Sequence, residues 1–315
     1  MNIQPADYIL QFAASLPSSQ GSHGTCFAAR TSGLFRSRDG GQIWEPAYAT
    51  LKIREALLTT CVVLAPTFEH DPTVFAGLNG AILRSHDGGE NWQRSRLPSP
   101  PPAISSLVIS PKYEQDATLF AGTNEDGVLK SSDSGRNWVA WNFGLLDLNI
   151  FCLAISPNFD ADETLYAGAE SGLFRSTNGG RAWREVPLPV GFDAVLSLAI
   201  SPDFAQDNTV LAGTENNGLL LSQDRGKSWH SLGEGTNHEP VNLILFPPAS
   251  PAKQDLFVLV GGTPLVSKDG GKTWKPWRAG RLTGKDVTAI LPPNRGRPGA
   301  PALVGFSNGT IKNIK

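Results

Sequence analysis

The sequence contains little sulfur and little histidine: its 315 residues include three cysteines, one methionine and five histidines. Cys26, Cys61 and Cys152 are odd in number, far apart and placed in apolar runs. This pattern predicts buried free thiols in a reducing compartment rather than a disulfide framework or a reactive nucleophile. The histidines form no metal-ligand spacing with a cysteine or with one another, so we expect neither a metal site nor a cofactor.

Strong charge of one sign and long apolar runs are also missing. Lysine and arginine total 27 against 29 acidic residues, a formal net charge of −2, so no general field attracts nucleic acid or an anionic membrane. No apolar run has the length that spans a bilayer, and the first 24 residues lack the basic region of a secretion signal. These absences predict a cytoplasmic protein that binds no nucleic acid and does not insert into membranes.

Turn-forming residues are abundant, with 33 glycines and 24 prolines, as in proteins built from short strands and tight turns. The motif Ser-x-Asp-x-Gly-x-x-Trp occurs six times, with Asn in place of Asp in the fourth copy. Its copies begin at Ser37, Ser85, Ser131, Ser176, Ser222 and Ser267. Successive copies are 45 to 48 residues apart, so the chain is a tandem array of one structural unit.

Each unit predicts four short strands, for example "VLSLAISP", "TVLAGT", "GLLLS" and a segment led by the tryptophan of the motif. Four such alternating runs in one unit are typical of a four-stranded antiparallel β-propeller blade. The C-terminal segments "DVTAILPP", "ALVGFS" and "GTIKNIK" match the first three strands of a seventh unit. We therefore predict an all-β fold, one seven-bladed propeller domain over residues 1–315.

The predicted blades are residues 8–52, 53–100, 101–147, 148–192, 193–238, 239–283, and 284–315 joined by 1–7. An open ring would leave the first and last blades with unpaired faces. We expect the residues around Asn2 to Gln4 to supply the missing outer strand of the last blade, over a length that Pro5 limits.

The repeated motif resembles the Asp-box, or BNR repeat, which occurs in sialidases, sortilin-type receptors, xyloglucan-degrading hydrolases and photosystem II assembly factors. The resemblance covers nearly the whole chain. Through "GLFRSRDGGQIW" and "AILRSHDGGENW" it is greatest to the photosystem II assembly and stability factors and to related uncharacterised BNR-repeat proteins. Because these families share the box without sharing one chemistry, the resemblance implies the fold rather than an activity.

The box residues have a structural role in this interpretation. The acidic position is expected to accept hydrogen bonds from turn amides, and the tryptophan to cover apolar surface between outer strands. The acidic positions are Asp39, Asp87, Asp133, Asn178, Asp224 and Asp269, and the tryptophans are Trp44, Trp92, Trp138, Trp183, Trp229 and Trp274. Each box offers one carboxylate, whereas a calcium loop needs several oxygen side chains, so we expect no calcium site.

Catalysis finds little support, and we predict no catalytic residues. The resemblance to sialidases implies a tyrosine nucleophile, but Tyr113 and Tyr166 occupy repeat positions that hold other apolar residues in sister blades. A glycosidase needs two opposed carboxylates. The acids left after the repeat positions are removed are Glu55, Asp147, Asp193, Glu239 and Asp286. They lie in connections between blades, where solvated loop acids are common, so a carbohydrate-binding protein or glycoside hydrolase is kept as the alternative.

A rigid platform for another protein is the function that remains, as in an assembly factor or a subunit of a larger complex. The resemblance implies a basic patch, and four consecutive blades carry a cation before the box serine: Arg36, Arg84, Lys130 and Arg175. These cations either contact a partner or pair within the ring with box carboxylates or tryptophans.

Aromatic and basic residues in two connections between blades are further candidates for partner contacts. These residues are Trp141, Phe143, Trp277, Arg278 and Arg281. We expect Trp141 to affect partner affinity more than folding. The turns "NEDG" and "ENNG" add acids to the same end of the ring.

Overall fold

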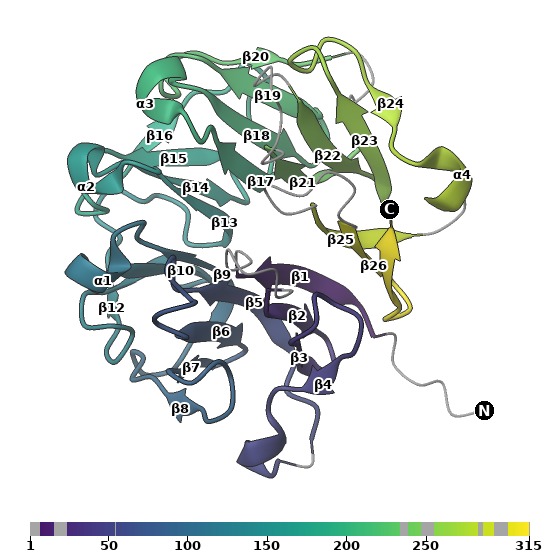
Figure 1. Ribbon diagram of the computed structural model, residues 1–315. Helices are drawn as coiled ribbons and strands as arrows, with labels where there is room; N and C mark the ends of the chain where they lie inside the picture. Colours follow the sequence, from purple (N-terminus) through teal and green to yellow (C-terminus); the bar gives the residue numbers. More distant parts are fainter. Residues whose placement is uncertain are drawn as a thin grey trace.

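The computed structural model describes residues 7–15, 24–53, 55–233, 239–246, 255–282, 286–292 and 302–314. Seven antiparallel sheets stand around a ring (Figure 1), which confirms the predicted seven-bladed β-propeller. In the described ranges six sheets have four strands and the seventh has three. In each sheet the strands follow chain order, so each blade is a simple meander.

The strands of the first four blades are β1 (Ile9–Ala14), β2 (Cys26–Arg30), β3 (Gly33–Ser37), β4 (Glu45–Pro46), β5 (Thr59–Leu64), β6 (Val74–Leu78), β7 (Ala81–Ser85), β8 (Gln93–Arg94), β9 (Ala103–Ile109), β10 (Leu119–Asn124), β11 (Val128–Ser131), β12 (Val139–Ala140), β13 (Ile150–Ile155), β14 (Leu165–Ala169), β15 (Leu173–Ser176) and β16 (Arg184–Val186). Those of the last three are β17 (Val195–Ile200), β18 (Val210–Thr214), β19 (Leu219–Ser222), β20 (His230–Ser231), β21 (Val241–Leu245), β22 (Leu256–Val260), β23 (Thr263–Ser267), β24 (Lys275–Pro276), β25 (Val287–Leu291), β26 (Ala302–Phe306) and β27 (Ile311–Ile314).

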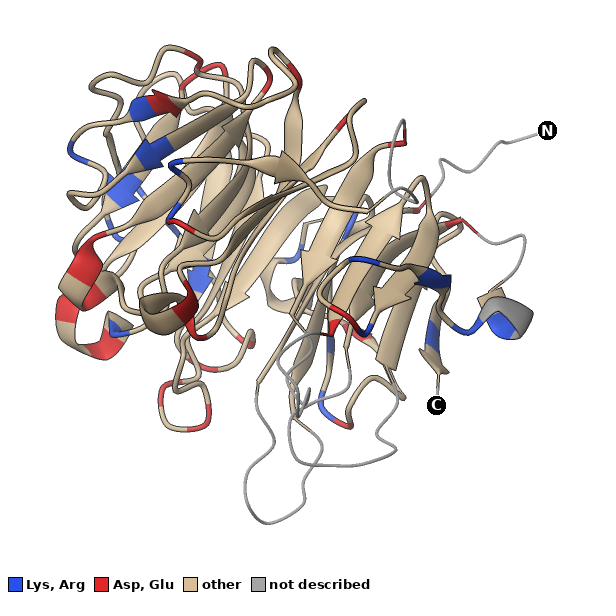
Figure 2. Ribbon diagram, turned by 90° about the horizontal axis from the view of Figure 1, so that it is seen from above, with Lys and Arg blue, Asp and Glu red and all other residues tan. Residues whose placement is uncertain are grey.

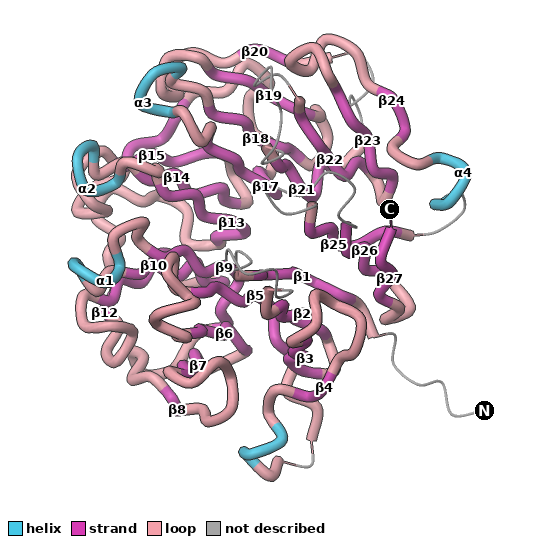
Figure 3. The backbone as a smooth tube through the Cα atoms, viewed as in Figure 1, coloured by secondary structure: helices cyan, strands magenta, loops and turns pink. Residues whose placement is uncertain are grey.

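Short helices lie at the periphery of the ring (Figure 3). Three of them join the first and second strands of blades three to five: α1 (Tyr113–Asp116), α2 (Phe159–Asp162) and α3 (Phe204–Asp207). Two others follow outer strands: the 3-10 helix η1 (Ala49–Leu51) and α4 (Ala279–Leu282). The acid that ends α2 fixes its turn, because Asp162 accepts the Ser156 hydroxyl at 2.8 Å and the Thr164 amide at 3.0 Å.

Every inner strand carries a β-bulge near its first residue. The extra residues are Leu10, Thr60, Ser105, Phe151, Leu196, Asn242 and Thr288. A bulge bends its strand and re-aims one side chain. In blade four the bulge leaves Phe151 37% exposed at the start of β13, next to the connection from blade three.

Close backbone approach joins several neighbouring blades, where a glycine in the second strand packs on a residue at the start of the next inner strand. A Cβ at Gly122 would lie 2.7 Å from Ile150 Cγ2, so only glycine fits. The contact recurs between blade seven and blade one, where a Cβ at Gly305 would lie 2.7 Å from Ile9 Cβ. The ring is therefore closed by the same packing that joins its other blades.

A hydrogen bond also links the two ends of the chain: Asn313 Nδ2 donates to Gly41 O at 2.9 Å, from β27 to the box of blade one. The predicted closing strand around Asn2 to Gln4 lies outside the described residues. Across the described ranges no helix has both the length and the apolar composition to cross a bilayer.

Candidate interaction surface

All six boxes form the same turn between the third and fourth strands. In blade two, Ser85 Oγ donates to Asp87 Oδ1 at 2.7 Å and accepts the Gly89 amide at 2.8 Å. Asp87 Oδ1 also accepts the Asn91 amide at 2.9 Å. One carboxylate oxygen therefore organises the whole turn. The equivalent serine-to-acceptor bonds in the other boxes are 2.7 to 2.9 Å long.

The second carboxylate oxygen accepts the side chain four residues further on in four boxes. The donors to it are Asn91, Asn137, Ser228 and Thr273. Blade four has the amide Asn178 at the acidic position and Ala182 at the donor position, so no second acceptor is required there. Asn178 Oδ1 still accepts the Ala182 amide at 2.9 Å, and the turn keeps its geometry.

Hydrogen bonds to the box carboxylates stabilise their ionised form. Burial alone would raise the pKa of Asp87, but donors from Asn91, Ser85 and Glu90 outweigh it and lower the pKa to about 2. The Thr273 hydroxyl and amide lower the pKa of Asp269 to about 2. These acids are therefore charged acceptors in the folded protein and poor proton donors.

Two of the box tryptophans, Trp92 and Trp183, donate hydrogen bonds from Nε1 to the blade before them. Trp183 is 2% exposed, and its Nε1 donates to Trp141 O at 2.8 Å, while its amide donates to Phe143 O at 2.8 Å. Trp92 Nε1 donates in the same way to Ala47 O at 2.9 Å. Each of these boxes therefore also holds the segment that leaves the preceding blade.

Of the two interpretations given for the cations before the box serine, the contacts of Arg36 favour pairing within the ring. This side chain is buried, with the residue 5% exposed, and its Nη1 donates to Gly88 O in the next box at 2.7 Å. It also pairs with Glu45 at 2.7 Å and with Glu90 at 3.2 Å. Arg36 therefore joins blades one and two, and its acidic partners are not the carboxylates at the repeated acidic position of the boxes.

The other three cations of this set are partly buried, and two of them contact the following box. Lys130 Nζ donates to Gly179 O at 3.4 Å and lies 5.1 Å from the centre of the Trp141 ring. Arg175 Nη1 donates to Arg225 O. Arg84 instead donates to Gln93 within its own blade at 2.9 Å. We therefore attribute to these cations a role between and within blades rather than a binding stripe.

Trp141 and Trp277 occupy one repeat position, directly after the outer strand. Their amides donate to Val128 O and Pro264 O, each at 2.8 Å, and extend the pairing of their blades. The Trp141 ring packs on Gly180 of the next box, where a Cβ would lie 2.9 Å from its Cδ1. Trp277 packs edge-on against Phe257 with 5.1 Å between ring centres. Both rings are partly buried, so neither is a freely exposed anchor.

Of the remaining predicted contacts, Phe143 is 80% exposed. Arg278 and Arg281 are exposed beside blade six, and the Arg278 guanidinium lies 5.6 Å from the centre of the Trp277 ring. The two arginines stay candidates for a contact at that edge of the ring.

Exposed apolar side chains are concentrated between blades three and five. From Val139 to Phe151 the chain carries five large hydrophobic residues that are at least 37% exposed: Val139, Phe143, Leu146, Leu148 and Phe151. Phe192, in the following connection, is 84% exposed. A grouping of apolar side chains at one side of a monomer is typical of an interaction surface.

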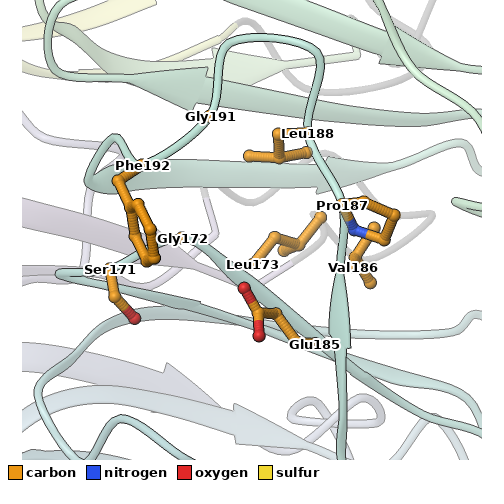
Figure 4. A pocket seen from close by; sticks show the side chains of 9 residues that line it. All are labelled: Ser171, Gly172, Leu173, Glu185, Val186, Pro187, Leu188, Gly191 and Phe192. Carbon is orange, nitrogen blue, oxygen red and sulfur yellow. The ribbon is translucent and has the colours of Figure 1, made fainter.

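Hydrogen bonds link the connection between blades three and four to the turns between the second and third strands of these two blades. Asp147 Oδ2 accepts the Ser171 amide at 2.7 Å, and Leu148 O accepts the Gly127 amide at 2.9 Å. Ser171 also lines a pocket of about 210 Å³ whose rim includes Phe192 (Figure 4). We call the surface formed by residues 143–151, 170–173 and 185–193 the blade-four surface. Sequence analysis found Phe143 but missed Leu146, Leu148 and Phe192.

Acidic residues surround this surface. Glu125, Asp126, Glu170, Glu185 and Glu215 are all exposed in it or in the adjoining turns. Figure 2 shows acidic segments on loops along the upper edge of the ring and on the helices at its lower left. The local charge is therefore negative, although the net charge of the chain is small.

Two of the acids considered for glycoside hydrolysis, Asp147 and Asp193, hold turns through hydrogen bonds. Asp193 is 5% exposed and accepts hydrogen bonds from the amides and side chains of Asn216 and Asn217. Burial acts to raise the pKa values of Asp193 and Asp147, yet their hydrogen bonds lower them. A general acid needs the opposite shift. The other three, Glu55, Glu239 and Asp286, are exposed.

Comparison with known proteins agrees with this architecture. The family model for photosynthesis system II assembly factor YCF48 matches residues 8–142, and the BNR/Asp-box repeat model matches residues 265–276. No curated protein sequence matches the chain.

Solved structures match almost the whole chain at low identity. YCF48 bound to D1 peptide is 18% identical, with a TM-score of 0.71, over 99% of this chain and 95% of that one. The extracellular domain of a putative hybrid two-component system from B. thetaiotaomicron is 16% identical, with a TM-score of 0.73, over 99% of this chain and 38% of that one. The GH74 xyloglucanase from Xanthomonas campestris is 15% identical, with a TM-score of 0.71, over 97% of this chain and 51% of that one.

The chain thus spans about two fifths to one half of the two larger proteins, and at these identities the likeness shows the fold alone. The ring and its six boxes define a seven-bladed propeller of the Asp-box, or BNR-repeat, class. Within that class the chain is similar to the photosystem II assembly factor YCF48.

Proposed function

We propose that the protein is a non-catalytic scaffold that binds another protein, in the manner of an assembly factor. The observation that carries this proposal is the blade-four surface, where Phe143, Leu146 and Phe192 are 80%, 77% and 84% exposed. Exposed aromatic and aliphatic side chains on a rigid frame suit partner contacts, because their burial releases water at little conformational cost.

The comparisons support a protein partner. The matching family model is described as an assembly factor, and one similar structure is YCF48 bound to D1 peptide. The basic residues predicted for a partner patch join or stabilise blades instead, so the proposed contact surface is apolar and acidic. A cytoplasmic location stays a prediction.

Carbohydrate recognition or hydrolysis is the alternative, and the similarity to GH74 structures favours it at the level of the fold. Within the connections of the described chain, however, Asp147 and Asp193 are committed to holding turns. We therefore favour the scaffold.

Affinity purification followed by cross-linking mass spectrometry tests the proposal. A photo-crosslinking phenylalanine analogue at position 143 is expected to capture a protein from the host, whereas the same analogue at Ile43, which is 74% exposed in the box of blade one, captures none. The double variant Phe143→Ala, Leu146→Ser should lose the partner, and Ile43→Ala should retain it. Retention by the double variant would contradict the proposal.

A further inference from the structure

The blade-four pocket is smaller than a typical small-molecule site. Its volume is about 210 Å³, and its lining includes Leu173, Val186, Pro187, Leu188 and Phe192. Sites for small molecules occupy roughly 300–1,000 Å³. This pocket is therefore too small for a sugar unit together with the sugar units linked to it. Figure 4 shows the side chains of Leu173 and Leu188 directed into the space between the 187–194 connection and β15. The pocket therefore suits one apolar side chain.

Hydrogen bonds hold the walls of the pocket in place. The Ser171 amide donates to Asp147, and the buried Asp193 carboxylate follows Phe192 and binds Asn216 and Asn217 of the next turn. The pocket is thus built before any ligand arrives, and a ligand would lose little affinity to ordering it.

The rim of the pocket is acidic. Glu185 lines it, and Glu170 directly precedes the lining residue Ser171. The Glu215 amide donates to Ala194 O at 2.9 Å, which brings a third carboxylate close to Phe192. Among the nine lining residues, all of them described, there is no lysine or arginine.

The nearest cation on the same strand belongs to the other face of the sheet. Arg184 lies opposite Arg175 in the strand pairing, and Glu185 lies opposite Phe174. Successive side chains of a strand point to opposite faces, so Arg184 points away from the face of Glu185, and it is not among the residues that line the pocket. An exposed phenylalanine ring beside carboxylates also attracts a cation.

We propose that this pocket takes one apolar side chain, of about leucine size, from a positively charged segment of a partner protein, with Glu185 and Glu170 binding the flanking lysine or arginine residues. This inference rests on the proposed function and names the partner chemistry at the same surface. Charge complementarity selects a basic segment, and the pocket selects its central apolar residue.

Isothermal titration calorimetry with three capped heptapeptides tests the proposal. The first probe is Gly-Lys-Arg-Leu-Arg-Lys-Gly, the second replaces its leucine with serine, and the third replaces its basic residues with glutamates. The first is expected to bind about tenfold or more tightly than either of the others, because leucine burial and charge pairing both contribute. Equal affinity for all three, or no binding of the first, would overturn the proposal.

Variants locate the binding. Glu185→Gln and Phe192→Ala should each weaken binding of the first peptide several-fold, whereas Arg184→Gln, on the same strand as Glu185, should not.

Displacement of the first peptide by a xyloglucan oligosaccharide would instead identify a glycan site and overturn the inference. If host-partner capture depends on Phe143 and Leu146 while the peptides show no preference, the pocket proposal fails and the scaffold proposal stands. If capture is unaffected by those two residues, the scaffold proposal fails.

Discussion

At the scale of single residues, the box glycines show how close packing and backbone conformation act together. Gly135 has a φ of +72°, and a Cβ there would lie 2.3 Å from Phe75 Cε1 in the preceding blade. Gly191 has the same φ of +72°, but a Cβ would meet no atom within 4 Å. Comparing substitutions at Gly135 and Gly191 therefore separates the energetic cost of backbone strain from that of steric clash.

We expect Gly191→Ala to lower the free energy of unfolding by about 1–2 kcal/mol, through the left-handed backbone alone. Gly135→Ala should cost a further 1–3 kcal/mol or so, because the side chain of Phe75 must move. Chemical denaturation of both variants measures the difference. Equal losses would mean that the blades relax freely at the box, contrary to the packing described above.

The box carboxylates predict a dependence of stability on pH. The pKa values of Asp87 and Asp269 are lowered to about 2 in the folded protein, against about 3.9 for an unfolded aspartate. Their contribution to stability is therefore complete above about pH 4 and is lost as the pH falls through 2. Asp87→Asn should reduce the acid sensitivity of the unfolding free energy between these values.

Asp87→Asn alone places its new NH₂ group against the Asn91 amide group and should cost about 1 kcal/mol at pH 7. Adding Asn91→Ala reproduces the Asn178–Ala182 pair of blade four and should recover part of this loss. Thermal melts from pH 7 to pH 2 measure both effects. An unchanged pH profile in the double variant would show that the box carboxylate is not the titrating group.

The repeated spacing predicts many residue roles, and the fold decides the rest. The recurrence of Asp and Gly around Asp87 and Gly89 was sufficient to predict an acceptor and a tight turn. The role of Arg36 was not predictable from local sequence, because its acceptor is the carbonyl of Gly88, in the box of the next blade. From the sequence alone, the cations before the box serine therefore fitted a partner-binding stripe as well as pairing within the ring.

At the scale of elements, each box is also a joint between blades. Trp183 directly precedes the outer strand of blade four and binds the segment that leaves blade three through two carbonyls, those of Trp141 and Phe143. The sequence expectation that Trp141 affects affinity rather than folding conflicts with its packing on Gly180. Both tryptophans are expected to stabilise this joint.

Trp183→Ala should lower the unfolding free energy by about 3–5 kcal/mol, because the residue is 2% exposed. Trp141→Ala should cost about 1–3 kcal/mol, since its ring is only partly buried. Trp183→Phe, which keeps most of the packing and removes the indole donor, should cost less than Trp183→Ala. Denaturant titrations check this order. An unchanged unfolding free energy in Trp141→Ala would contradict the role of Trp141 in joining blades three and four.

The alternating apolar runs predicted the strands well, but two kinds of local structure were not predictable from them. The bulge at Phe151 depends on pairing with β14, which periodicity does not encode. Leu146, Leu148 and Phe192 follow or flank strand-like segments, so their apolar character resembled core. Only Gly144 and Gly191, turn-forming residues close to these apolar residues in the sequence, indicated that the segments are connections.

At the scale of the whole molecule, one chain must join its first and seventh blades without a peptide bond between them. The described part of blade seven has three strands, and its seam with blade one is held by packing and by hydrogen bonds that include Asn313 to Gly41 and Arg30 to Gly309. Ile9 and Ile150 are both 0% exposed and occupy the same position in blades one and four. Ile9 meets Gly305 across the closure, whereas Ile150 meets Gly122 at an ordinary seam.

If the closure is as tight as the other seams, Ile9→Ala and Ile150→Ala should each lower the unfolding free energy by about 2–5 kcal/mol. Both variants should unfold in one transition, because every blade depends on its neighbours for a buried face. Calorimetry together with denaturant unfolding measures this. A much smaller loss for Ile9→Ala, or an early transition confined to that variant, would show that the ring opens between blades seven and one, since the two substitutions remove the same atoms from equivalent buried sites.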